Sequence, residues 1–390
     1  MKIMNEKLIL FFVILFMLSC KKDNSTTELI PKQKDKFSLA IKDSIKLKIP
    51  NYSTIERSPV FYYEKDSVNE LYFLTSNVYM KQNELIIYDL NTKEEAKKII
   101  FPFEGNDAFP LIHGLTIKSP DSLFTTNYYE TNIYLFNSTP NLIDKYSYKY
   151  ETKNQVLEKL FSNTILNNKI IYNDEKLYFS PKFNSHKFDN KQSLAFYLDL
   201  KSNKIVNQDF HFPEDFYKSP YFTHLLSREF NGKEFIYASK KNHNLWVTDI
   251  EHKKVKTINA KSRYFKSFSK SKRGIDVNKR LFNSVYYSIY GPIIYDKYRK
   301  LYYRFFYPGI DVNKRDKKLM IKSKYKSFFT IMILDQNFKI IDEIVMPKDV
   351  YDSNVFFVSK DGLNISTNHI NNPTFDENYL KFNTLQLIQK

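Results

Sequence analysis

Apolar and polar residues alternate with a period of two through most of this chain, and long apolar stripes with a period of 3.6 are scarce. A period of two is the pattern of strands whose successive side chains face opposite sides of a sheet. Aromatic residues make up 17% of the chain, and they fit the half-buried surface of a pleated sheet. We therefore expect an all-β protein.

A weak repeat runs through this strand pattern. Polar residues followed by Leu or Phe and further apolar residues occur six times, at Leu71, Leu123, Leu177, Phe235, Leu301 and Leu363. After most of these comes an apolar strand that runs into an Asp or Asn turn, at Asp89, Asn137, Asp199, Asp249 and Asp335. A further strand then completes each hairpin.

Six units of about 50 to 65 residues, each built from strands and turns, are typical of a β-propeller with four-stranded blades. The sixth unit lacks an outer hairpin, and the early strand that begins at Ser44 can complete it. Such closure removes open sheet edges. We predict one six-bladed β-propeller, residues 37–390, closed by the N- and C-terminal strands in one blade. The alternative is a pair of two-sheet sandwiches with accidental spacing.

The N-terminus carries an apolar run of eleven residues, Leu8 to Leu18, followed by Ser19 and the chain's one cysteine, Cys20. The run is too short for a membrane span, which needs about 20 residues, and it follows two lysines as in a secretory signal. Residues 17–20 resemble the bacterial lipobox. We predict a signal peptide over residues 1–19, lipidation of Cys20 and a flexible tether over 20–36. A plain signal peptide with an incidental cysteine and an uncleaved anchor are the alternatives.

The net charge of +17 is concentrated in one segment. Residues 251–326 hold 22 Lys and Arg against five Asp and Glu, interleaved with Tyr and Phe. Cations and aromatic faces together can bind polyanions. For an exported lipoprotein we expect an anionic glycan, lipid A or an envelope protein as partner, and no nucleic acid. The alternative is biased codon usage in half-exposed strands.

Within this segment the heptapeptide GIDVNKR occurs twice, at residues 274–280 and 309–315. Its Asp-x-Asn resembles the first half of a calcium loop. The Lys and Arg that come next would repel a cation, so we predict no metal and no other cofactor. A duplicated loop, its copies paired side by side, is the better interpretation.

Common catalytic and nucleotide-binding motifs are absent from the sequence. We therefore predict a non-catalytic binding or scaffold protein of the outer membrane, monomeric and facing the cell surface or the periplasm. One alternative is a hydrolase or lyase acting on a glycan or peptide, another an envelope sensor or assembly partner. In an enzyme, histidines near the blade connections would converge, namely His113, His211, His224 and His369.

The lipobox, the turns of the DLNTK type, the DSLF segment and the stretch Gly291–Arg304 (GPIIYDKYRKLYYR) together resemble the DUF4221 lipoproteins of Bacteroidetes. That resemblance implies a six-bladed propeller of the TolB-like kind and an uncharacterised function, and it supplies no catalytic residues. Its sharpest part includes Arg299, Tyr302, Tyr303 and Arg304, which are our candidate binding residues. The tyrosines can instead belong to the blade core.

Overall fold

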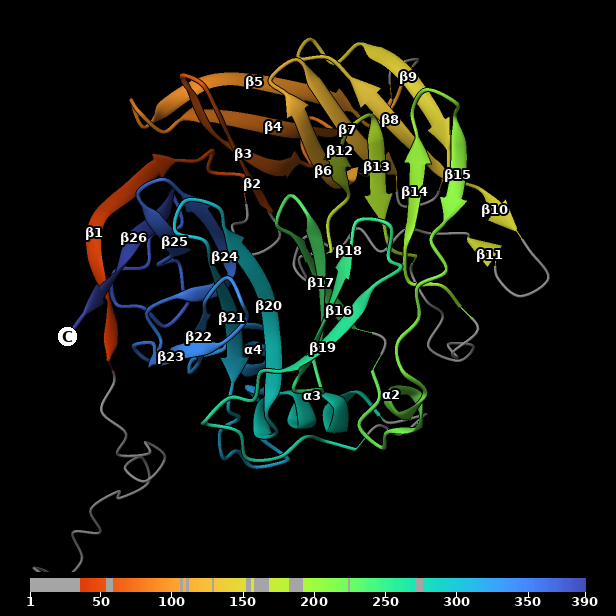
Figure 1. Cartoon of the computed structure of the whole chain (residues 1–390). Coiled ribbons are helices and arrows are strands. Elements are labelled where there is room, and N and C mark those ends of the chain that lie inside the picture. Colours follow the sequence, from red (N-terminus) through yellow and green to blue (C-terminus); the bar gives the residue numbers. More distant parts are fainter. Residues whose placement is uncertain are drawn as a thin grey trace, which may run out of the picture. The chain divides into compact units, whose positions relative to one another are not determined.

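The computed structural model describes residues 36–53, 59–105, 108–109, 112–127, 130–151, 156–157, 168–181, 192–223, 225–270 and 276–390. These residues form six four-stranded antiparallel sheets, arranged as the blades of a ring (Figure 1). The predicted six-bladed β-propeller is thereby confirmed.

Each blade is numbered by its place along the chain. Blade 1 contains β2 (Val60–Lys65), β3 (Val68–Asn77), β4 (Gln82–Asp89) and β5 (Glu94–Pro102). Blade 2 contains β6 (Ile112–Ser119), β7 (Ser122–Asn127), β8 (Asn132–Phe136) and β9 (Leu142–Ser147). Blade 3 contains β12 (Ile171–Asn173), β13 (Lys176–Phe179), β14 (Phe196–Asp199) and β15 (Lys204–Asn207). A small hairpin of β10 (Tyr150–Glu151) and β11 (Val156–Leu157) lies between blades 2 and 3 in the sequence.

Blade 4 contains β16 (Leu226–Phe230), β17 (Glu234–Ser239), β18 (Asn244–Asp249) and β19 (Val255–Asn259). Blade 5 contains β20 (Ile289–Asp296), β21 (Leu301–Tyr307), β22 (Thr330–Leu334) and β23 (Ile340–Val345). Blade 6 contains β24 (Asp352–Ser359), β25 (Gly362–Ser366), β26 (Tyr379–Gln389) and β1 (Phe37–Lys48). The helices in the described part of the chain are α2 (Glu214–Lys218), α3 (Val277–Tyr286) and α4 (Leu319–Lys324).

The ring closes in blade 6, where β1 from the N-terminus pairs antiparallel with β26 from the C-terminus. The predicted strand at Ser44 lies inside β1, opposite Asn383. The carboxylate of Asp342, in the outer strand of blade 5, accepts hydrogen bonds from the main-chain N–H groups of Lys36 and Phe37, both at 2.8 Å. The start of the propeller is thus held by both its own blade and its neighbour.

The sequence repeat corresponds to the blades. Its six apolar anchors all lie in the second strand of a blade, and its five Asp or Asn residues lie at the ends of third strands. At Asp199, for example, Oδ1 accepts hydrogen bonds from the main-chain N–H groups of Lys201 and Ser202. Such Asx turns satisfy main-chain donors locally, which explains why the signal recurs.

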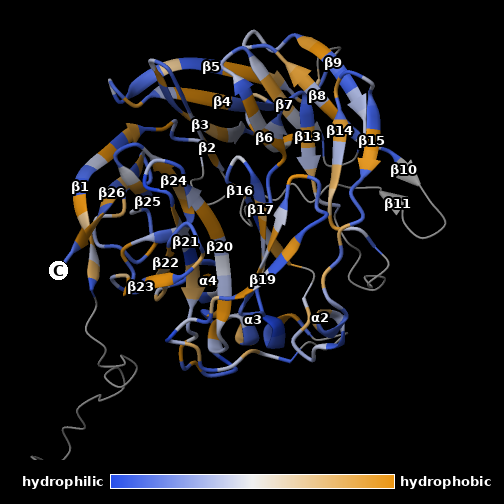
Figure 2. Cartoon of the chain, in the orientation of Figure 1, coloured by the Kyte–Doolittle hydropathy of each residue, from blue (hydrophilic) through white to orange (hydrophobic). Residues whose placement is uncertain are grey.

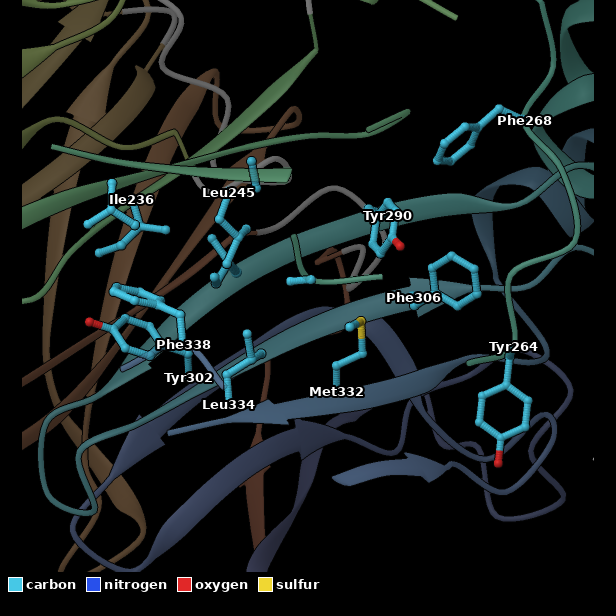
Figure 3. Packing of buried hydrophobic residues seen from close by; sticks show 14 residues of the cluster. Ile236, Leu245, Tyr264, Phe268, Tyr290, Tyr302, Phe306, Met332, Leu334 and Phe338 are labelled. Carbon is cyan, nitrogen blue, oxygen red and sulfur yellow. The ribbon is translucent and has the colours of Figure 1, made fainter. Parts of the chain in front are cut away.

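The core lies between neighbouring blades. Figure 3 shows the cluster between blades 4 and 5, where Ile236 and Leu245 pack near Tyr302, Leu334 and Phe338. Each blade buries side chains from both of its faces, since it packs between two others. This arrangement explains the near-continuous burial of central strands such as β21 and β22.

The two ends of the ring differ in their connections. At one end of the ring, which we call the short-turn face, the strands within each described blade are connected by turns of five residues or fewer. At the other end, the long-loop face, lie the connections between blades and those between second and third strands, which include residues 208–225, 260–288 and 308–329. The helices α2, α3 and α4 all belong to these long connections (Figure 1).

Candidate functional site

Two long connections of blades 4 and 5 form the basic cap, which we define as residues 276–288 and 308–326. Helix α3 begins where the side chain of Asp276 accepts a hydrogen bond from the main-chain N–H of Lys279, at 2.9 Å, as is usual for an N-cap. Phe282 and Val285 then fall on one face of the helix and pack against Leu319 of α4. The cap therefore has a small apolar core of its own.

The described part of the first GIDVNKR copy, residues 276–280, and the second copy, residues 309–315, lie in this cap in different conformations. The described end of the first copy begins helix α3, because apolar residues come after it and continue the amphipathic pattern. The second copy is not helical, and there Asn313 Oδ1 accepts from the N–H of Arg315 in a tight turn. Val312 packs against the apolar core of the cap, and the N–H of Ile310 donates to the carbonyl of Val285. The second copy thus packs on the helix that the first copy begins.

The surface of the cap is strongly basic. Its exposed cationic residues are Lys279, Arg280, Lys314, Arg315, Lys317, Lys318 and Lys324. Of its acids, Asp276 caps the helix and Asp316 pairs with Lys322 at 2.6 Å. Figure 2 shows the hydrophilic character of α3. Exposed apolar side chains lie among these charges, at Val277, Tyr286, Met320 and Ile321.

The four candidate binding residues lie outside the cap, in blade 5. Arg299, in the turn between β20 and β21, contacts the buried carboxylate of Asp296 with its Nε at 2.5 Å. Its two Nη atoms donate to the carbonyls of Ser359 and Lys360 in blade 6, at 2.8 and 2.9 Å. Arg299 thus connects two blades on the short-turn face.

Tyr302 and Tyr303 are both buried. The hydroxyl of Tyr302 accepts a hydrogen bond from Asn231 of blade 4 at 2.7 Å, and its ring stacks on Phe338 (Figure 3). The hydroxyl of Tyr303 donates to the carboxylate of Asp296 at 3.2 Å. Burial raises the pKa of both phenols above their usual range.

Arg304 is completely buried. Its guanidinium donates to the carbonyls of Asn242, His243 and Ala260 in blade 4, at 2.7 to 2.9 Å. It also stacks on Tyr290, with 3.7 Å between the guanidinium carbon and the ring centroid. Burial lowers the pKa of Arg304 to about 10, so it remains charged at neutral pH. These contacts favour packing roles for Tyr302, Tyr303 and Arg304, and ligand binding by the four candidates stays a prediction.

Three lysines are partly buried, Lys240 and Lys241 in blade 4 and Lys326 at the end of the cap. Lys241 Nζ donates to the carbonyl of Ser269 at 3.0 Å, and Lys326 Nζ donates to the carbonyl of Ser284 at 2.5 Å. Burial lowers the pKa of Lys240 to about 8, and burial together with the charge of Lys240 lowers the pKa of Lys326 to about 7. A count of basic residues could not single out these lysines, because the count does not separate buried amines from exposed ones.

The described histidines do not form a common cluster. His369 is buried in the β25–β26 connection, where its Nδ1 accepts from the N–H of Asn371 and its Nε2 lies 3.7 Å from Asp349. His211 lies 3.1 Å from Asp209 in the connection between blades 3 and 4. Burial lowers the pKa of His369, so it is neutral at pH 7. The side chain of His113, and His224 as a whole, lie outside the described residues, as does Cys20.

The described residues offer neither a metal cluster nor a membrane-spanning helix. No group of three or more of their His, Cys, Asp or Glu side chains is arranged to hold a metal ion. Among the helices of the described part, none has the length and apolar character that crossing a membrane requires.

Comparison with solved structures shows the fold. A DUF4221 family member from Bacteroides vulgatus is 20% identical, with a TM-score of 0.78 over 92% of this chain and 100% of that chain. The calcium-binding protein regucalcin from Agrobacterium tumefaciens is 10% identical, with a TM-score of 0.42 over 90% and 94% of the two chains. Virginiamycin B lyase from Staphylococcus aureus is 8% identical, with a TM-score of 0.41 over 88% and 99%. The last two scores are too low to support any inference about activity.

No curated protein matches this chain. The sequence profile of DUF4221, a domain of unknown function, matches residues 49–345, which include the first five blades. The chain therefore belongs to the DUF4221 family.

Proposed function

We propose that this protein is a lipid-anchored, non-catalytic propeller of the outer envelope that binds an acidic glycan through its basic cap. The observation that carries the proposal is the exposed charge of the cap, seven cationic side chains on two adjoining connections. Cations gathered on one surface attract a polyanion and raise its association rate. The exposed Tyr286 and its apolar neighbours offer contact surface for the sugar rings.

The direction of the N-terminal strand supports a ligand-binding role for the cap. β1 begins at the short-turn face and runs toward the long-loop face, since it pairs antiparallel with β26. A tether that precedes Lys36 therefore joins the domain at the end opposite the cap. An anchor at Cys20 would leave the cap free to meet a ligand.

Glycan binding is tested with the whole mature chain, polygalacturonate as the acidic probe and dextran as the neutral one. The cap variant reverses three exposed charges, Lys314→Glu, Lys317→Glu and Lys318→Glu. We expect it to bind polygalacturonate at least about tenfold more weakly at low ionic strength, and we expect added salt to weaken binding by the wild type.

The matched control reverses three exposed charges on the short-turn face, Lys233→Glu, Lys254→Glu and Lys297→Glu. Its net charge equals that of the cap variant, so equal losses in the two variants would assign binding to net charge and contradict the proposed site. Equal binding of dextran and polygalacturonate by the wild type would also contradict it.

The anchor is tested by protease accessibility on intact cells, with Cys20→Ala as the control. We expect the wild type to fractionate with membranes and the variant to be released. Digestion of the wild type while cells stay sealed would place the propeller at the cell surface, and protection until lysis would place it in the periplasm. Unchanged membrane association of the Cys20→Ala form would contradict the lipid anchor.

A further inference from the structure

Two partly buried lysines lie on the long-loop face, one in blade 4 and one at the end of the basic cap. Lys240 lies in the short connection between β17 and β18 of blade 4, and Lys326 lies near the end of the connection between β21 and β22 of blade 5. Tyr290 donates its N–H to the carbonyl of Lys240, and the ring of Tyr307 lies 5.8 Å from Lys326 Nζ. These two tyrosines lie at the same end of the paired strands β20 and β21, so the two lysines occupy one region, where the charge of Lys240 acts on Lys326. Both residues are neither fully buried nor fully exposed.

The surroundings of these amines place them at the inner strands of the ring. The carbonyl of Lys240 accepts from the N–H of Tyr290 in β20, and its N–H donates to the carbonyl of Leu225, just before β16. Lys326 Nζ lies 5.8 Å from the ring centroid of Tyr307. The Tyr307 hydroxyl donates to Ser353 in β24, at 3.1 Å. Strands β16, β20 and β24 are the first strands of blades 4, 5 and 6, and β20 contacts both of the others. The amines thus lie at the centre of the long-loop face.

No carboxylate within the described chain pairs with either amine. Lys326 donates to the carbonyl of Ser284, and Lys240 Nζ makes no hydrogen bond or ion pair with a described residue. The neighbouring cations Lys241 and Arg304 are held by main-chain carbonyls. Glu343 acts electrostatically on Arg304, whereas no described carboxylate acts on Lys240 or Lys326, so these two amines have no described acid beside them.

Partly buried cations of like sign are unfavourable unless a counter-charge accompanies them. An oxyanion between two ammonium groups would accept charge-assisted hydrogen bonds from both, and it would offset their mutual repulsion. We propose that Lys240 and Lys326 together bind an oxyanion, a phosphate, sulfate or carboxylate group of a ligand, at the centre of the long-loop face. This site is separate from the exposed lysines of the cap and does not require that the cap bind a glycan.

The test is calorimetric titration of the whole mature chain with sodium phosphate, sodium sulfate and sodium acetate, each at low ionic strength and pH 7. We expect one of these oxyanions to bind with a stoichiometry of one. Each of the variants Lys240→Met and Lys326→Met should weaken that binding by at least about tenfold, because each removes one charged donor. The preferred anion distinguishes a phosphoryl, a sulfuryl and a carboxyl ligand.

Two further variants separate loss of the site from loss of the fold. Lys240→Arg keeps the charge and should retain measurable binding, whereas Lys317→Met removes an exposed lysine of the cap and should bind as the wild type does. Failure of all three anions to bind the wild type overturns the proposal. Equal weakening by Lys317→Met and Lys240→Met also overturns it, since general charge would then explain the binding.

Discussion

Replacing Arg304 by methionine separates a packing role from a binding role for this completely buried candidate residue. The Arg304 guanidinium donates to three main-chain carbonyls of blade 4, those of Asn242, His243 and Ala260. It also covers the ring of Tyr290 at 3.7 Å. Methionine fills much of the same space but donates no hydrogen bond, so the variant leaves the three carbonyls without this donor.

The expected cost is set by these contacts. At about 1 kcal/mol for each carbonyl, the loss is about 3 kcal/mol. The lost cation–π contact adds up to about 2 kcal/mol. Removing a buried charge also relieves its desolvation cost, a gain similar in size to the cation–π loss. We therefore expect the Arg304→Met variant to lose about 3 kcal/mol of unfolding free energy.

Urea denaturation, monitored by the fluorescence of the chain's single tryptophan, the buried Trp246, measures this loss. With a denaturant slope of about 3 kcal/mol per molar, the midpoint should fall by about 1 M. Arg280→Met, at an exposed position of the cap, is the control and should change stability by no more than about 0.5 kcal/mol. An unchanged midpoint for Arg304→Met together with lost polygalacturonate binding would refute the packing argument.

Three further predictions concern closure, the cap and pH. Asp342→Ala removes the acceptor of the first two N–H groups of the propeller and should lower the free energy of unfolding by about 2 kcal/mol. Hydrogen exchange in β1 should become faster, and unchanged exchange would contradict a role for Asp342 in closing the ring. Gly309→Ala would place a Cβ 2.2 Å from the carbonyl oxygen of Tyr286, at a φ of +84°, so hydrogen exchange over residues 310–326 should quicken; Gly232→Ala, which has a φ of +95° and no atom within 4 Å of its Cβ, is the control and should leave that exchange unchanged. Because the pKa of Lys326 is lowered to about 7 in the folded state, the unfolded chain binds more protons above that pH. Stability should therefore rise from about pH 7 toward pH 10, by up to about 1.4 kcal/mol per pH unit, and Lys326→Met should flatten that rise in urea titrations; an identical slope in wild type and variant would contradict the assignment.

The blades could be predicted from the sequence because their signals are local. Alternation of side chains defines a strand over a few residues, and an Asp such as Asp199 closes a turn with the N–H groups of the residues after it. The six anchors and the five turn residues accordingly fell at equivalent strand positions in the structure. The closing strand in β1 was predictable for a related reason, since the last unit lacked a strand.

The exposure of side chains was not predictable in this way. Tyr302, Tyr303 and Arg304 combine aromatic and cationic side chains as a half-exposed strand can, yet β21 is buried almost throughout because blades pack on both of its faces. Which face of a strand meets solvent depends on the neighbouring blades, and local alternation carries no record of them.

The sequence by itself determined the strands, the turns and the order of the blades, whereas the tertiary structure decided which cations face solvent and which are buried or partly buried. The identical heptapeptides show the limit of local information, because one begins α3 and the other forms a turn, depending on the residues next to each copy and the surface against which it packs. Lys240 and Lys326 are distant in the sequence, and their contacts with Tyr290 and Tyr307 bring both of them to the same end of blade 5. The proximity of residues so distant in the sequence depends on the packing of whole blades, which no short segment of sequence encodes.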